Sequence, residues 1–218
     1  MIFMWYIFRH GETFKNKSKI KQGHTKYSFL TFEGVLQVHM NGLKLKDLEE
    51  NFSDYKFLCS PLERTYHSCQ LIIESLGLKD TSPIVEDFIL SRNRGKIETY
   101  KEKELEEFFP EETKKIKENI WGYKFEGYES YKDFYLRLAQ FIKKYENEKN
   151  LVIVAHKGLN RNLMYLIKKN TEVENLIEWI NNLSDEEGSS LINDLSNKVK
   201  TFDQNYFYSW DGNEFIKI

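Results

Sequence analysis

The sequence is poor in cysteine and proline, with two cysteines and three prolines among 218 residues. Two thiols, Cys59 and Cys69, are too few for a disulfide framework or a cysteine-rich zinc site, so we expect both to be unpaired in a reducing compartment. No Pro/Ser-rich linker, low-complexity tract or internal repeat divides the chain. A single domain over residues 1–218 is therefore the simplest organisation.

The chain also lacks an excess of one charge and any long apolar run. Its net charge of -2 provides no overall basic field to attract nucleic acid or an anionic membrane. The apolar start, residues 1–8, has no basic region before it and ends at Arg9, which is not typical of a signal peptide. No other stretch approaches the length of a membrane span. We expect a cytoplasmic protein without nucleic-acid or membrane partners.

Apolar segments that are rich in aromatic and β-branched residues indicate strands buried on both faces. Three such segments occur, at residues 2–8, 56–59 and 151–155. Each runs directly into a polar motif. Because chemistry gathers at the carboxyl ends of parallel strands, this placement predicts one shared site. The alternation with helical patterns predicts a three-layer α/β/α sandwich with a mainly parallel central sheet.

Helical patterns separate these strands. Thr31 can cap a helix that carries Phe32, Val35, Leu36 and Leu43 on one side, and Ser60-Pro61 opens a second helix. Residues 130–145 repeat apolar and aromatic side chains at helical spacing, which is more typical of core than of a ligand site. Asp211-Gly212 separates two apolar runs and predicts a terminal hairpin. The charged stretch 99–128 is interpreted as an excursion over the active site, where Tyr100, Trp121, Tyr123 and Phe125 would wall the pocket.

The motif Arg9-His10-Gly11-Glu12-Thr13, with Asn16 after it, follows the first strand. An imidazole nitrogen can attack phosphorus when the negative charge of the phosphate is neutralised. Arg9 offers a rigid fork of donors that matches phosphate oxygens, and Gly11 would let the backbone approach the anion. Taken alone, this motif is as well explained by an arginine and a histidine that meet by chance on a surface loop.

Two further motifs follow the other strands. Arg64, in Ser60-Pro61-Leu62-Glu63-Arg64, can point back at the strand end, and His156, before Lys157-Gly158, can stabilise phosphoryl charge if it is protonated. Taken alone, Arg64 and His156 are each compatible with a residue that has no catalytic or binding role. The three strand ends together carry an Arg-His pair, an arginine and a histidine, and this combination favours a phosphate pocket.

The ordered set of motifs resembles the histidine phosphatase superfamily, in its phosphoglycerate mutase-like branch. The resemblance spans roughly residues 2–168 and includes the Arg9–Thr13 motif with Asn16, Gln22-Gly23-His24, Leu30-Thr31 with Gly34 and Gln37, Ser60-Pro61-Leu62 with Arg64, Gly127 with Glu129-Ser130 and Arg137, and His156 with Gly158 and Arg161. It implies a phosphohistidine on His10, which water then hydrolyses. It further implies a phosphate pocket of Arg9, Arg64 and His156, joined by Asn16, Gln22 and Gly23, and no metal or cofactor.

Three residues depart from the family pattern. Ser91 stands where the branch usually has the glutamate that protonates the leaving oxygen, Thr99 replaces a glycine, and Lys157 replaces the glycine after the last histidine. Lys157 either contacts substrate or faces water. The candidates for a replacement acid are Glu98, Asp87 and Glu86.

The resemblance implies hydrolysis of a small phosphorylated cytosolic metabolite. A phosphoglycerate mutase is the first alternative, although the long segment of such mutases is not recognised and Ser91 argues against it. A non-catalytic phospho-ligand binder is the second alternative, although a binder need not retain the nucleophile. Sugar phosphates, nucleotides, phosphoglycerate and phosphoproteins all fit as substrates, and no motif indicates an oligomeric state.

Overall fold

The computed structural model describes residues 4–20, 22–48, 51–198 and 203–218 and contains a six-stranded sheet in the order β3-β2-β4-β1-β5-β6. The strands are β1 Met4–Arg9, β2 Lys56–Cys59, β3 Ile84–Val85, β4 Asn150–Ala155, β5 Tyr208–Trp210 and β6 Phe215–Lys217. The pairs β1/β4, β4/β2 and β2/β3 are parallel, and β5 and β6 add an antiparallel hairpin to β1. The three predicted strands and the hairpin are thereby confirmed, while residues 2 and 3 lie outside the described part of the chain.

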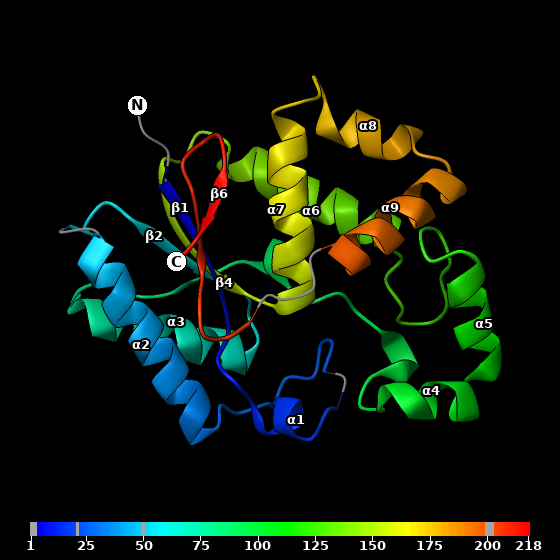
Figure 1. The fold of residues 1–218 in the computed structure, drawn as a ribbon, viewed down its shortest axis with the longest axis horizontal. Helices are drawn as coiled ribbons and strands as arrows, with labels where there is room; N and C mark the ends of the chain where they lie inside the picture. Colours follow the sequence, from blue (N-terminus) through cyan, green and yellow to red (C-terminus); the bar gives the residue numbers. More distant parts are fainter. Residues whose placement is uncertain (1–3, 21, 49–50, 199–202) are drawn as a thin grey trace.

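Helices cover both faces of the sheet, as predicted for a three-layer sandwich (Figure 1). They are α1 Phe14–Lys17, α2 Phe32–Leu48, α3 Glu63–Leu76, α4 Glu102–Phe108, α5 Pro110–Glu118, α6 Tyr131–Tyr145, α7 Lys157–Asn170, α8 Leu176–Asn182 and α9 Asp185–Lys198. The core on one face includes α2 and α3, and the core on the other includes α6, α7 and α8. In the part of the chain that the structure describes, no helix has the length and apolar character to cross a membrane.

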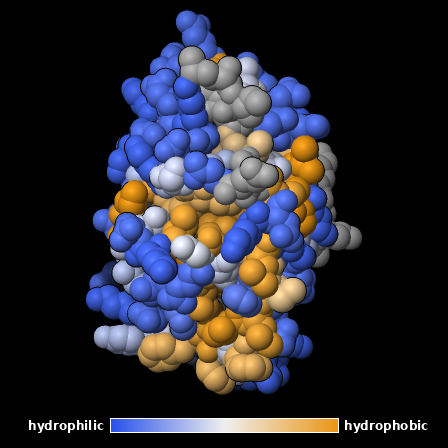
Figure 2. Space-filling model, turned by 90° about the vertical axis from the view of Figure 1, so that its left-hand side faces the viewer, coloured by the Kyte–Doolittle hydropathy of each residue, from blue (hydrophilic) through white to orange (hydrophobic). Residues whose placement is uncertain are grey.

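The helix α2 begins as predicted, because the hydroxyl of Thr31 accepts a hydrogen bond from the backbone N–H of Gly34 at 3.0 Å. The predicted apolar face of α2 is wrong. Phe32 is 79% exposed and Leu36 is also exposed, whereas the buried face consists of Gly34, Val38, Asn41, Gly42 and Leu45. This face includes Gly42 because α2 lies so close to α3 there that a side chain at Gly42 would meet Ser75. Figure 2 shows apolar residues on the molecular face where α2 lies in Figure 1.

The helix α6 begins after Ser130, whose hydroxyl accepts the backbone N–H of Asp133 at 3.1 Å. Its predicted stripe is buried in the core, as at Leu138 and Phe141, but Tyr131 and Phe134 at its start also line the pocket at the strand ends. The second predicted helix starts two residues later than expected: α3 begins at Glu63, and Pro61 lies before it. Cys59 and Cys69 are free, and both thiols are buried on the α3 side of the sheet.

The stretch 99–128 differs from the expected pocket wall. It contains the helices α4 and α5, and Trp121 is fully buried in the core, where its ring packs at 5.1 Å from that of Tyr135. Tyr100 and Phe125 surround a separate small core around Ile97. None of the described residues 99–128 lines the pocket at the strand ends. The aromatic side chains in this stretch therefore pack against one another and against the core of the domain.

Candidate active site

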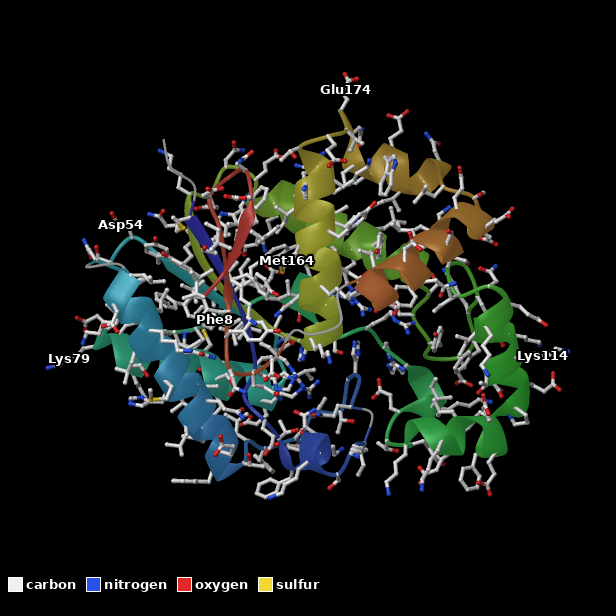
Figure 3. The ribbon with its side chains drawn as sticks, viewed as in Figure 1. Phe8, Asp54, Lys79, Lys114, Met164 and Glu174 are labelled. Carbon is white, nitrogen blue, oxygen red and sulfur yellow. The ribbon has the colours of Figure 1, made fainter. Side chains whose placement is uncertain are left out.

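The carboxyl ends of β1, β2 and β4 meet at one edge of the sheet, because these strands are parallel neighbours with Arg9 opposite Ala155 and Cys59 opposite Val154. A pocket of about 230 Å³ opens at this edge, smaller than the roughly 300–1,000 Å³ of sites for drug-sized ligands. Figure 3 shows nitrogen-bearing side chains gathered below the labelled Phe8, at the end of β1. Five cationic residues line the pocket, and none of its described lining residues is acidic; the cations are Arg9, Arg64, Arg92, Arg94 and Lys157.

His10 directly follows β1 and is buried in the pocket. Its Nδ1 lies 2.8 Å from the carbonyl oxygen of Gly11. A carbonyl only accepts, so Nδ1 carries the proton and Nε2 keeps its lone pair. Burial lowers the pKa of His10 well below 6.5, and the charges of Arg64 and Arg9 lower it further. The ring is therefore neutral at neutral pH and able to act as a nucleophile through Nε2.

His156 follows β4 and faces His10, with ring centroids 5.4 Å apart. Its Nε2 lies 3.0 Å from the hydroxyl of Ser60, and its buried Nδ1 has no hydrogen-bond partner among the described residues. Burial, followed by Arg64 and His10, lowers the pKa of His156 well below 6.5. The ring is thus neutral at neutral pH, in contrast to the protonated ring considered from sequence. A phosphate dianion beside it would favour the protonated form.

Arg64 is the second residue of α3 and is fully buried. Its terminal nitrogens donate to the carbonyl oxygens of Gly23 at 2.9 Å and Thr25 at 3.0 Å, while its Nε has no partner among the described residues. Burial lowers the pKa of both Arg64 and Arg9 to about 10, so both keep their charge at neutral pH. Two fixed guanidinium groups at the ends of neighbouring elements are suited to hold a tetrahedral anion.

The pocket also includes the other predicted binding residues, Asn16, Gln22, Gly23 and Lys157. The Oδ1 of Asn16 accepts from Thr13 at 3.1 Å, and the Oε1 of Gln22 accepts from Ser28 at 2.7 Å. With their oxygens engaged, both amides have N–H groups left to donate to an anion. Lys157 is exposed at the start of α7.

Gly11 does not contribute as expected from sequence, because it does not line the pocket. Its N–H donates to the hydroxyl of Ser68 at 3.1 Å, and a side chain at this position would lie 2.3 Å from the carbonyl oxygen of Gly34. Gly11 is needed for the close passage of the strand end against α2 rather than for contact with an anion.

The three candidate acids all lie outside the pocket lining. The carboxylate of Glu98 accepts the backbone N–H groups of His24 at 2.8 Å and Arg94 at 3.1 Å. Glu86 is buried and accepts from Lys144 at 2.6 Å, and Asp87 is exposed. Ser91, at the usual position of the acid, does line the pocket. The described pocket lining thus brings together the residues predicted to bind phosphate, but it contains no carboxylic acid.

Sequence reasoning missed the pocket residues Arg92, Arg94 and Tyr131. The guanidinium of Arg92 lies over the rings of Tyr131 at 4.2 Å and Tyr128 at 4.7 Å and donates to the carbonyl oxygen of Glu129. Burial acts to raise the pKa of Tyr131, but Arg92 and Arg94 outweigh it and lower the pKa. The available signal was the pair of arginines beside Ser91, in the segment that supplies the acid in the family.

An ion pair between α6 and the segment before it fixes the chain around Ser91. Arg137 binds both carboxylate oxygens of Glu129 at 2.8 Å and donates to the carbonyl oxygens of Phe88 and Leu90 at 2.7 and 3.0 Å. The side chain of Glu129 also accepts the N–H of Asn93 at 3.1 Å. Bidentate geometry and several shared partners make this ion pair a rigid support for the pocket wall.

The described residues contain no cluster of three or more histidine, cysteine, aspartate or glutamate side chains placed to hold a metal ion. In the residues that line the pocket, the positive charge comes from arginine and lysine. Arginine and lysine side chains are suited to contact an anion directly through charge-assisted hydrogen bonds.

Comparison with solved structures identifies phosphatases of the same fold. The alpha-ribazole phosphatase from Shigella flexneri matches with a TM-score of 0.71 at 20% identity, over 95% of this chain and 90% of its own. A candidate alpha-ribazole-5'-P phosphatase from Escherichia coli matches with a TM-score of 0.74 at 19% identity, over 99% and 94%. A mycobacterial glucosyl-3-phosphoglycerate phosphatase in complex with VO3 matches with a TM-score of 0.62 at 19% identity, over 82% and 86%.

The sequence itself matches a family model over residues 5–184, which is most of the chain and includes every strand end at the pocket. The α/β fold agrees with that of the similar phosphatase structures. The chain therefore belongs to the histidine phosphatase superfamily, in its branch 1.

Proposed function

We propose that the protein hydrolyses the phosphomonoester of a small metabolite through a phosphohistidine on His10. The observation that carries the proposal is the neutral, buried ring of His10, whose Nδ1 is hydrogen-bonded to a carbonyl oxygen and which lines the same pocket as Arg9 and Arg64. Family membership supports phosphatase activity. The names of similar structures, which include phosphatases for alpha-ribazole and glucosyl-3-phosphoglycerate, support a small substrate.

In the first step, the lone pair of His10 Nε2 forms a bond to phosphorus while the bond from phosphorus to the leaving oxygen breaks. Arg9 and Arg64 neutralise the equatorial oxygens, and the fully buried Arg64, which two backbone carbonyl oxygens hold, needs little reorganisation. In the second step, water attacks phosphorus, the P–N bond breaks, and inorganic phosphate leaves with His10 restored. His156 gains a proton as negative charge arrives and donates its Nδ1 or Nε2 hydrogen to a phosphoryl oxygen.

We also propose a cytoplasmic location. The proposed route uses the positive charge of arginine side chains and includes no metal ion. We expect dialysis against EDTA to leave turnover within twofold. A larger loss that a divalent cation restores would contradict the metal-free route.

The test is a rapid quench of the protein with labelled substrate, followed by mapping of acid-labile phosphate. We expect the label on His10 in the wild type, no label in His10→Gln, and a slower but visible label at His10 in His156→Gln. A label on His156 with His10 unlabelled would overturn the assignment of the nucleophile. Assays with 3-phosphoglycerate and 2,3-bisphosphoglycerate separate the alternatives, because a hydrolase releases phosphate, a mutase interconverts phosphoglycerates, and a binder does neither.

A further inference from the structure

The pocket holds more positive charge than one phosphoryl group requires. A phosphomonoester carries a charge of about -1.5 to -2 at neutral pH, and we assign the two arginines Arg9 and Arg64 to it. Arg92, Arg94 and Lys157 line the same pocket, and no acidic side chain lines it in the described residues. The two buried histidines are neutral at neutral pH. Three cations therefore remain beyond those that the transferred group needs.

Arg92 is committed to protein contacts. Its side chain is buried, lies over two tyrosine rings and donates to the carbonyl oxygen of Glu129 at 2.6 Å. It therefore acts as part of the pocket wall. The charge that is available to a ligand comes from Arg94 and Lys157.

Arg94 lines the pocket with a half-buried side chain. The backbone of Arg94 is held by a hydrogen bond from its N–H to the carboxylate of Glu98 at 3.1 Å and by an antiparallel β-bridge to Tyr128. No hydrogen bond or ion pair joins its guanidinium to another described residue, in contrast to nearby Lys96, which pairs with Glu112 at 2.5 Å. A guanidinium held at a pocket wall without a counterion loses hydration that an anionic ligand would replace.

Lys157 reaches the pocket from the start of α7, a different element from the one that supplies Arg94. Within the described residues, its ammonium group also has no ion-pair partner. Ser91 lines the same pocket with a short, uncharged side chain. Two cations from different elements therefore reach one pocket, and neither has an ion-pair partner among the described residues.

We infer that Arg94 and Lys157 form a subsite for a second anionic group, so that the substrate is a phosphomonoester whose leaving portion carries a carboxylate or a second phosphate. The inference rests on the proposed function, because it assigns Arg9 and Arg64 to the transferred phosphoryl group. Both residues contact the part of the substrate that departs, and they select among substrates rather than take part in the chemistry.

The test compares matched ligands that differ in one charged group. Dissociation constants are measured by calorimetry on the His10→Gln protein, which cannot form the phosphohistidine. Glycerol 3-phosphate is compared with 3-phosphoglycerate for a carboxylate, and glucose 6-phosphate with glucose 1,6-bisphosphate for a second phosphate. A charge-assisted hydrogen bond corresponds to a factor of about 10 to 150 in affinity, so we expect the doubly anionic member of at least one pair to bind 10-fold tighter or more.

Arg94→Gln and Lys157→Gln, each in the same background, should reduce that ratio at least about threefold. Lys96→Gln removes the same charge from the same segment outside the pocket and should leave the ratio unchanged, with thermal melts to verify folding of all three. Ratios within twofold of one for both pairs, or ratios that survive both pocket substitutions, would overturn the subsite. A wild type that turns over no phosphomonoester but keeps the binding ratio would refute the proposed function and leave the subsite standing.

Discussion

The absence of an acid at Ser91 predicts a strong dependence of turnover on the leaving group. An alkoxide that leaves from a sugar or glycerol phosphate is a strong base and needs a proton in the transition state, whereas a nitrophenolate leaves without one. The described lining of the pocket contains no carboxyl group, and Glu98 is engaged by two backbone N–H groups. General acid catalysis contributes about 10²–10⁴-fold, or about 3–5 kcal/mol of barrier. We expect aryl phosphates to react faster than alkyl phosphates by a factor in this range.

Ser91→Glu should recover part of this factor for alkyl phosphates and barely change the aryl rate. The recovery should be larger at pH 5.5 than at pH 8, because Arg94 and the other pocket cations favour the ionised carboxylate, which cannot donate a proton. Ser91→Gln is the matched control, since it has the same length but no acidic proton. The assay is kcat/KM for 4-nitrophenyl phosphate and glycerol 3-phosphate over this pH range.

Equal rates of the wild type on aryl and alkyl phosphates would refute the reasoning, because they require another proton donor. Tyr131 would then be tested first, as Tyr131→Phe, because it lines the pocket and neighbouring arginines lower its pKa. Glu98→Gln, Asp87→Asn and Glu86→Gln follow. Loss of only the alkyl activity in one variant would identify the donor.

Three further predictions test the anion site and the backbone. Arg64→Ala should weaken inhibition by vanadate at least 10-fold, since a charged hydrogen bond contributes about 1.5–3 kcal/mol; unchanged inhibition would place the anion elsewhere. Because burial lowers the pKa of His10 and His156, unfolding takes up protons below pH 6.5, and stability should fall as pH drops from 7 to 5. In denaturant titrations, the free energy of unfolding should fall by up to about 1.4 kcal/mol per pH unit for each ring. The slope should be smaller in His10→Gln, and an equal slope in that variant would contradict the lowered pKa of His10. Thr99 has a φ of 74°, a backbone conformation that disfavours a β-branched residue. Thr99→Gly should relieve roughly 1 kcal/mol of strain and raise the melting temperature by about 2–4 °C. A lower melting temperature would show that the turn is not strained.

The strand ends were predictable because their information is local. A buried strand followed by His10, Ser60 or His156 fixes both the element and the edge at which the side chain emerges, and parallel pairing then brings the three together. The face of α2 was not predictable in the same way. Its apolar residues suggested one side, but the close passage of α3 at Gly42 decides which side is buried, and that contact joins residues far apart in the sequence.

The environment of Arg94 depends on contacts that a sequence pattern does not contain. Glu98 resembles a candidate acid when it is judged by residue type and position, yet its carboxylate binds the N–H groups of His24 and Arg94 and lies against Gly23. It therefore positions two pocket segments and moderates the positive charge near Arg64, whose pKa it acts to raise. Glu98 is thereby engaged with backbone groups outside the described pocket lining, whereas the side chain of Arg94 lines the pocket. Residue type and position alone could not distinguish these two placements, because they depend on contacts between segments far apart in the sequence.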